Sequence, residues 1–309
     1  MWHKICTAIM KLKQGVFLSH IDEKIMLLKL KNKNLLQEYK KCKTYYKLKK
    51  QYGYLLTRSE PAGIDSDISS KMPVWTCWFQ GEENAPPLVR SCLKSMRNCF
   101  GKENVKIITD ENFADYVLLP EFILEKYNTN IISRTHFSDI LRTELLYRYG
   151  GIWIDSTVFC SALEIPEYIS DSDFFCYSVV DMTRNDCLPI VASSWFLKAE
   201  KNNPIIAKTR ELIFAYWKKE KHLCNYNLFH IFFALASEVY KEVWNKVPVF
   251  SNIQPHIMQF ELFKPYSKER IMQIFRGADF HKLNWRLMKK EKDDTYTNYD
   301  WILRHTDDE

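Results

Sequence analysis

The chain has 309 residues, of which 46% are hydrophobic and 15% aromatic, so it can bury the core of one large domain, with or without an appendage. It has only eight glycines and no internal repeat, which argues against a solenoid or a loop-rich architecture. The formal net charge is +6, but residues 1–60 hold 14 Lys and Arg against four Asp and Glu, so the rest of the chain is acidic overall.

The cysteine content indicates the compartment. Nine cysteines occur without a CxxC pair, and residues 1–10 contain no long apolar run of the kind found in a cleavable signal peptide. We therefore expect a reducing, cytoplasmic compartment in which most thiols are buried as small apolar side chains. No stretch approaches the roughly 18 consecutive apolar residues that a transmembrane helix needs, so membrane association is expected only at the periphery of the inner face.

The N-terminal segment, residues 1–58, is predicted to be helical in amphipathic patches, because leucines alternate with lysines and six lysines cluster in residues 40–50. Two interpretations are open. The segment is either a solvated lead-in that docks on the body of the protein, or it binds an anionic membrane surface, where each basic residue contributes about 1 kcal/mol. Nucleic acid is not expected as a partner, because the basic run stands apart from any nucleic-acid-binding motif.

A linker and an α/β domain are predicted next. Residues 59–72 are polar and rich in turn-forming residues, which is typical of a linker to a domain over residues 73–309. The apolar and aromatic run 73–79 reads as a buried strand. A helix over about 87–99 and a strand over 105–109 follow, and this alternation predicts a sheet with crossover helices.

The most informative stretch is residues 133–160, SRTHFSDILRTELLYRYGGIWIDSTVFC. Its first half has apolar residues at helical spacing, and the glycine pair Gly150 and Gly151 then ends the predicted helix. The short apolar run 152–154 reads as a buried strand that stops at a carboxylate. The stretch therefore predicts a helix, a glycine turn and a strand in close succession.

Three polar side chains mark this stretch as a candidate ligand site. Asp139 and Arg142 are three residues apart and share one face of the helix. Asp155 follows the strand, at the edge where open α/β sheets bind ligands. Taken singly, these residues are more typical of a surface ion pair and of a turn. Their fixed order along the chain is what predicts a site.

This stretch resembles the core of the DxD-containing sugar transferases. It is most similar to the capsular polysaccharide synthesis protein family, which is related to glycosyltransferase family 32 and to glucosylating toxin domains. The resemblance rests on residues 138–142 and 146–155 and extends more loosely over residues 72–285. It implies a GT-A fold, a Rossmann-like mixed sheet with flanking helices, that binds a nucleotide sugar and a divalent cation, Mn²⁺ or Mg²⁺.

The resemblance also implies roles for individual residues. Asp139 and Arg142 would contact the donor sugar and nucleotide, and Asp155 would lie near the ribose and the metal. The pocket for the base or ribose would be lined by residues of the opening strand, namely Trp78, Phe79 and Gln80. The sequence departs from the family pattern at the last position of DxD, where Thr157 offers a hydroxyl, a poorer ligand for a hard cation than a carboxylate.

Two later segments carry further candidates. Residues 280–285 resemble a His-bearing segment of the family, so His281 would supply the metal ligand that Thr157 weakens, and Lys282 would neutralise the departing diphosphate. An ordinary surface His–Lys pair is the alternative. Tyr226 and His230 open a helix similar to one on the acceptor side of the family, although His230 also fits a core position.

We therefore expect a hexosyltransferase that moves a hexose from a nucleotide sugar, in particular a UDP-sugar, to a surface polysaccharide or a lipid-linked oligosaccharide. The resemblance implies retention, and no convincing carboxylate nucleophile is present, which favours a front-face mechanism. Three alternatives are open. One is a haloacid-dehalogenase-like phosphatase with Asp155 as its nucleophile, although Thr157 stands where that motif needs an Asp. The others are a catalytically weakened nucleotide-sugar-binding protein and an adaptor that acts through residues 1–58.

Overall fold

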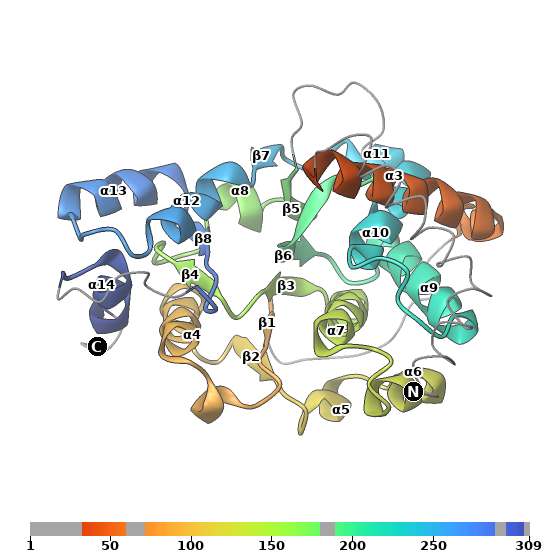
Figure 1. Cartoon of the computed structure of the whole chain (residues 1–309), viewed down its shortest axis with the longest axis horizontal. Coiled ribbons are helices and arrows are strands. Elements are labelled where there is room, and N and C mark those ends of the chain that lie inside the picture. Colours follow the sequence, from red (N-terminus) through yellow and green to blue (C-terminus); the bar gives the residue numbers. More distant parts are fainter. Residues whose placement is uncertain (1–32, 60–71, 180–188, 288–294, 306–309) are drawn as a thin grey trace.

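The computed structural model describes residues 33–59, 72–179, 189–287 and 295–305 (Figure 1). Its centre is a six-stranded mixed sheet in the order β2-β1-β3-β6-β5-β7. The strands are β1 (Val74–Cys77), β2 (Val105–Ile108), β3 (Gly151–Ile154), β5 (Phe174–Ser178), β6 (Ala192–Ala199) and β7 (Phe250–Ser251). β1 runs parallel to β2 and β3, whereas β6 runs antiparallel to β3 and β5. The predicted Rossmann-like mixed sheet is confirmed.

Helices cover both faces of this sheet. One face packs against α7 (Arg134–Tyr149), α9 (Pro204–Lys219) and α10 (Leu228–Val239), and the other against α4 (Pro87–Phe100) and a small sheet of β4 (Val158–Cys160) and β8 (Phe280–Lys282). Figure 1 shows α4 and α7 on opposite sides of β1 and β3. The remaining helices are α3 (Lys33–Gln51), α5 (Phe113–Tyr116), α6 (Glu121–Asn128), α8 (Glu167–Ser170), α11 (Lys241–Trp244), α12 (Ile253–Glu261), α13 (Lys268–Gly277) and α14 (Asn298–His305).

The alternation of side chains along the strands explains the two covered faces. Successive residues of a strand point to opposite faces. Trp75 and Trp153 accordingly enter the core beside α7, whereas Val74 and Ile152 enter the core beside α4. Because both faces are apolar, the strands read in the sequence as continuous buried runs, and the predicted strands at 73–79, 105–109 and 152–154 are confirmed.

The predicted glycine turn is confirmed and has a steric cause. α7 begins at its cap Ser133, whose hydroxyl accepts from the His136 N–H, and ends at Gly150 with a positive φ of 66°. Gly151 also has a positive φ, of 90°, and a Cβ there would lie 2.2 Å from the Pro73 carbonyl oxygen. Only a glycine permits this close approach, which brings β3 beside β1 directly after the helix.

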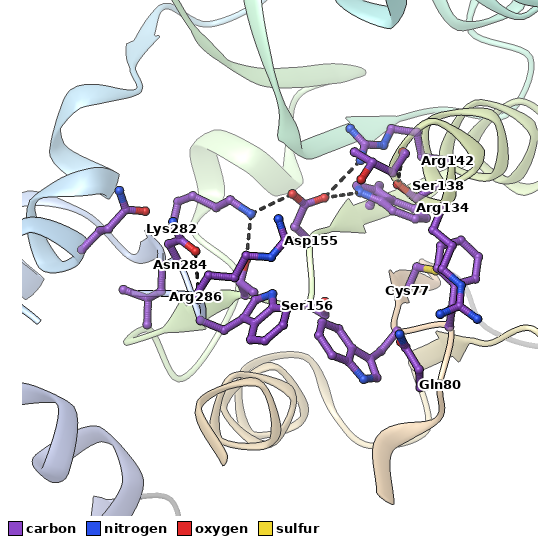
Figure 2. Close-up of a pocket in the computed structure, with 18 of the residues that line it drawn as sticks. Cys77, Gln80, Arg134, Ser138, Arg142, Asp155, Ser156, Lys282, Asn284 and Arg286 are labelled. Atoms are coloured by element: carbon purple, nitrogen blue, oxygen red, sulfur yellow. Dashed lines mark hydrogen bonds and ion pairs between the residues drawn. The ribbon is translucent and has the colours of Figure 1, made fainter. Parts of the chain in front are cut away.

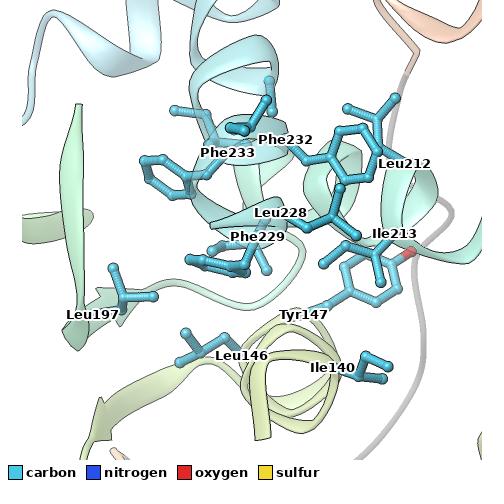
Figure 3. Close-up of a cluster of buried hydrophobic side chains, with 14 of the residues drawn as sticks. Ile140, Leu146, Tyr147, Leu197, Leu212, Ile213, Leu228, Phe229, Phe232 and Phe233 are labelled. Carbon is cyan, nitrogen blue, oxygen red and sulfur yellow. The ribbon is translucent and has the colours of Figure 1, made fainter. Parts of the chain in front are cut away.

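A large apolar core fixes the position of α7 on the side of the helix that faces away from its polar residues Asp139 and Arg142. Figure 3 shows Ile140, Leu146 and Tyr147 of α7 facing side chains of α9, α10 and β6. A buried carboxylate adds to this packing, since Glu144 is fully buried and pairs with Arg148 at 2.6 Å and with Arg210 of α9. α7 is therefore a rigid support for the polar residues on its other side.

The N-terminal helix α3 docks on the body. Tyr45 and Leu48 of α3, and Tyr52 directly after it, are buried in the core to which α10 also contributes, and Lys49 pairs with Glu238 of α10 at 2.6 Å. Residues 1–32 and most of the predicted linker lie outside the described residues. In the part of the chain that is described, no helix is both long and apolar enough to cross a bilayer.

Candidate active site

A cavity of about 490 Å³ lies at the carboxyl ends of the parallel strands β1 and β3 (Figure 2). Its walls come from the residues that follow β1, from the exposed face of α7, from the turn after β3, from α12 and from the segment that begins at the end of β8. Carboxyl ends of neighbouring parallel strands are where open α/β sheets bind ligands. The cavity therefore lies at the edge of the sheet where the sequence predicts a ligand site.

Asp155 is the charged centre of this cavity. Its Oδ1 lies 3.2 Å from Arg142 Nη2, and its Oδ2 accepts a hydrogen bond from Lys282 Nζ at 2.8 Å. Figure 2 shows the two cations reaching Asp155 from opposite sides. Burial alone would raise the pKa of Asp155, but the positive charges of Lys282 and Arg142 more than offset burial and hold the pKa at about 2. The carboxylate is therefore ionised at neutral pH.

Arg142 is held rigidly between two carboxylates. Its side chain is 5% exposed, and Nη1 donates to the Ser194 carbonyl at 2.9 Å and lies 3.3 Å from Asp139 Oδ1. The guanidinium also lies over the ring of Trp153, 4.9 Å from its centroid. Arg142 Nε is buried without a hydrogen-bond partner among the described residues. The guanidinium thus presents a fixed positive charge at the wall of the cavity.

Asp139 lies one layer behind Arg142. It is 7% exposed and does not line the cavity. Because the Trp217 indole N–H donates to His136 Nε2 at 2.8 Å, we assign the ring proton of His136 to Nδ1, which lies 3.2 Å from Asp139 Oδ2 and donates to it. Asp139 therefore orients Arg142 in this structure, and direct contact of Asp139 with a donor sugar stays a prediction.

Aromatic side chains line the end of β1. Trp78, Phe79 and Gln80 all border the cavity, as the sequence predicts. The Trp78 ring makes an edge contact with Trp285 at a centroid separation of 5.6 Å. Arg134 lies over Phe79, 6.0 Å from the ring centroid. This wall offers flat apolar surfaces and an amide, which are the groups that stack on a nucleobase and bond its edge.

The sequence matches a family model over most of its length. The model, described as "Capsular polysaccharide synthesis protein", matches residues 24–300. The chain belongs to the capsular polysaccharide synthesis protein family. The family resemblance drawn from the helix with Asp139 and Arg142, the glycine pair and Asp155 is thereby confirmed, and the structure has the mixed α/β sheet with flanking helices that was expected from it.

Three curated relatives match part of this family member. O-glycosyltransferase braB from Annulohypoxylon truncatum is 27% identical over 48% of this chain and 38% of its own length. O-glycosyltransferase PaGT from Phomopsis amygdali is 30% identical over 32% of this chain and 27% of its own length. The probable glycosyltransferase FCK3 from Fusarium pseudograminearum is 22% identical over 56% of this chain and 49% of its own length. The chain thus spans less than half the length of each.

Two solved structures cover most of the chain at low identity. The PaToxG glycosyltransferase is 16% identical, with a TM-score of 0.35, and the alignment covers 87% of this chain and 96% of that one. The bifunctional glycosyltransferase WbbM is 10% identical, with a TM-score of 0.39, and the alignment covers 80% of this chain and 51% of that one.

The residues predicted to hold a metal do not converge. Asp155 and Thr157 border the cavity, but His281 is fully buried on the other side of β8, where its Nε2 lies 2.9 Å from Ser161 Oγ. Burial lowers the pKa of His281 to about 3, so its ring is neutral. No group of three or more His, Cys, Asp or Glu side chains suited to a metal occurs within the described residues. A divalent cation at this site stays a prediction.

Of the two residues predicted on the acceptor side, Tyr226 borders the cavity and His230 does not. Tyr226 is 71% exposed. Burial lowers the pKa of His230 to about 4, with a smaller opposing effect of Asp139. Its Nδ1 is buried without a hydrogen-bond partner among the described residues. His230 is half-buried beside Phe229, and a role on the acceptor side stays a prediction.

Several cavity residues carry no signal in the sequence. His256 and Gln259 reach the cavity from α12, a helix without any motif. Arg134 and Arg286 also border it, and both are single basic residues that resemble surface positions when read along the chain. The sequence offered one signal, which is nearness along the chain to predicted site residues. Arg134 precedes Asp139 and Arg142 on α7, and Arg286 closely follows Lys282.

Proposed function

We propose that this chain is a glycosyltransferase that moves a hexose from a nucleotide sugar, in particular a UDP-sugar, to a surface polysaccharide or a lipid-linked oligosaccharide. The observation that carries the proposal is the placement of Asp155 between Arg142 and Lys282 at the carboxyl ends of β1 and β3. Membership in the capsular polysaccharide synthesis protein family supports the class of activity. The three curated relatives, each named as a glycosyltransferase or probable glycosyltransferase, support it too.

The walls of the cavity suggest how the donor lies. The base would rest on the aromatic wall at the end of β1, and the diphosphate would lie beside Arg142 and Lys282, because charge developing on a leaving group needs fixed cations. Asp155 is ionised and can accept a hydrogen bond from a hydroxyl of the ribose or the sugar. Tyr226, which is 71% exposed, also borders the cavity, and the acceptor would enter beside it.

The carboxylates near the cavity favour transfer without a covalent intermediate. Among the described residues that border the cavity, Asp155 is the only carboxylate, and each of its oxygens is engaged by a cation. Such a carboxylate is a poor nucleophile toward the sugar. We therefore propose a front-face reaction with retention of configuration. A phosphatase that uses Asp155 is not favoured, because Thr157 stands at the second motif position and accepts a hydrogen bond from Lys282.

A nucleotide-sugar screen tests the proposal. A donor that binds only the folded chain stabilises it, by about 2.7 kcal/mol at a concentration of 100 times Kd. We expect one UDP-sugar to raise the melting temperature more than free UDP does, because both the diphosphate and the sugar contact the cavity. If no nucleotide or nucleotide sugar at millimolar concentration changes the melting temperature, the proposed function is wrong.

The outer face of α3 supports a membrane-bound acceptor. Lys43, Tyr46 and Lys47 are exposed on this face. Thr44 Oγ1 accepts a hydrogen bond from Asn225 Nδ2 at 3.2 Å, so α3 touches the loop that carries Tyr226 to the cavity. An anionic bilayer bound to this basic and aromatic face would lie near the acceptor side. We propose peripheral binding of α3 to the inner membrane face.

Charge reversal on α3 tests this membrane proposal. The triple variant Lys43→Glu, Lys47→Glu and Lys50→Glu should bind phosphatidylglycerol vesicles about a hundredfold more weakly, since each basic residue contributes about 1 kcal/mol. Co-sedimentation with vesicles measures the affinity. The matched control reverses three exposed basic residues elsewhere, Lys102, Lys268 and Arg276. Equal weakening of both triple variants would show only a net-charge effect and would contradict the role of α3.

A further inference from the structure

The Lys282 ammonium lies between the two side chains that the family motif assigns to a metal. Its Nζ donates to Asp155 Oδ2 at 2.8 Å and to Thr157 Oγ1 at 2.7 Å. Asp155 and Thr157 stand at the first and last positions of the D-x-T motif. The Lys282 side chain therefore already supplies a cation that binds both motif positions. We infer that Lys282 replaces the divalent cation, so that this chain binds its donor and transfers sugar without a metal.

The register of β8 explains why a lysine and not a histidine faces the cavity. Val158 pairs with Lys282 and Phe159 pairs with His281 in the small antiparallel sheet. Because successive strand residues point to opposite faces, only one of the two neighbours can reach Asp155. His281 packs instead between the rings of Phe159 and Phe275. The strand therefore places the Lys282 ammonium at the cavity and the His281 imidazole on its other face.

The remaining oxygens are a poor coordination shell for Mn²⁺ or Mg²⁺. Mg²⁺ demands near-octahedral oxygen coordination that usually includes one or two carboxylates. Here one carboxylate is available, both its oxygens already contact cations, and the second motif position is a neutral hydroxyl. A divalent ion that contacted Asp155 Oδ2 and Thr157 Oγ1 would have to displace the ammonium from between them, against like-charge repulsion.

The cavity has enough positive charge to hold a diphosphate by itself. Four cationic side chains of the described residues border it, Arg134, Arg142, Lys282 and Arg286, against the single carboxylate of Asp155. An ammonium has three donors. Two of those of Lys282 are used by Asp155 and Thr157, which leaves one for a phosphate oxygen. This fixed positive charge would stabilise the negative charge that develops on the leaving group, as a metal ion does in other sites.

The inference rests on the proposed function, and the reaction that it describes is balanced. The bond from the anomeric carbon to the β-phosphate oxygen breaks, and its electron pair stays on that oxygen beside Lys282 and Arg142. The acceptor hydroxyl oxygen bonds to the anomeric carbon from the same face. The hydroxyl proton passes to the departing phosphate oxygen. No oxidant, reductant or further reactant is needed.

Chelation of the full-length chain is the direct test. We expect the rate of nucleotide-sugar consumption and the calorimetric Kd for UDP to change less than twofold between excess EDTA and added Mn²⁺. Loss of turnover in EDTA that Mn²⁺ restores would overturn the inference and leave the proposed glycosyltransferase standing. Failure to bind UDP or to consume any nucleotide sugar in either buffer would overturn the proposed function, and the inference with it.

Variants at the motif sharpen this test. Lys282→Met should weaken UDP binding at least tenfold and lower the rate about 10²- to 10³-fold, whereas Lys264→Met, an exposed lysine of the loop between α12 and α13, should change neither. The double variant Thr157→Asp with Lys282→Ala restores a second carboxylate and vacates the cation position. It should bind Mn²⁺ in an electron paramagnetic resonance titration while the wild type does not. Equal Mn²⁺ binding by both would contradict the inference, even if Lys282→Met failed to fold.

Discussion

Replacement of Arg142 by methionine is expected to lower the rate of transfer about 10²- to 10³-fold and to reduce the free energy of unfolding by about 3–5 kcal/mol. Both effects have one cause. Arg142 is 5% exposed and is the shared partner of Asp139 and Asp155. Its loss removes a fixed positive charge from the cavity wall, leaves the buried Asp139 carboxylate without its guanidinium and leaves Asp155 with Lys282 as its remaining cation. Nucleoside diphosphate release and urea denaturation measure the two effects.

The matched control is Arg270→Met. Arg270 makes an ion pair of 2.6 Å with Glu261, but its side chain is 45% exposed and lies outside the cavity. An exposed pair of this kind contributes about 1 kcal/mol or less, so this variant should keep the wild-type rate and nearly all of the stability. A rate for Arg142→Met within threefold of the wild type would remove Arg142 from the site.

The second large effect is expected for Asp155→Asn, which keeps the shape of the side chain and removes its charge. Transfer should fall by about 10²- to 10³-fold, because Lys282 and Arg142 lose the carboxylate that holds them in place. The cations lower the pKa of Asp155 from its ordinary value of 3.8 to about 2. That shift corresponds to stability on the order of 2 kcal/mol at neutral pH that the variant lacks.

The pH dependence of this difference gives a sharper test. Because the folded-state pKa is depressed, the contribution of Asp155 is complete above the unfolded-state pKa of about 4 and is lost as pH falls toward 2. The difference in free energy of unfolding between wild type and Asp155→Asn should therefore be constant from neutral pH to about 5 and shrink below 4. A difference that stays constant down to pH 2.5 would show that Asp155 is not held by its cations.

Much of the fold was predictable, because its decisive signals are local. Ser133, the glycine pair and the apolar run after it fix α7, the turn and β3 within a single stretch, and each of these elements is confirmed. The antiparallel insertion of β6 between β3 and β5 was not predicted. Strand order depends on pairing between residues far apart in the chain, such as Trp153 with Leu197, for which a single sequence gives no signal.

The site was predictable where one segment carries it and not where distant segments meet. The placement of Trp78, Arg142 and Asp155 around one cavity agrees with the sequence, because strand ends and a helix face determine it. Asp139 lies behind Arg142 and does not line the cavity. Its carboxylate is hydrogen-bonded to His136, which Trp217 of α9 holds in place through a second hydrogen bond. The choice between His281 and Lys282 depends on the register of β8 with β4, which is set by long-range pairing.

The most direct test of a glycosyltransferase centred on Asp155 is nucleoside diphosphate release from a panel of nucleotide sugars, with wild type and Asp155→Asn compared side by side. We expect the wild type to consume one UDP-sugar, faster when an acceptor is present. We expect the variant, shown to be folded by circular dichroism, to consume it at least about a hundredfold more slowly. Equal rates for the two proteins, or no consumption of any nucleotide sugar by the wild type, would contradict the proposed function.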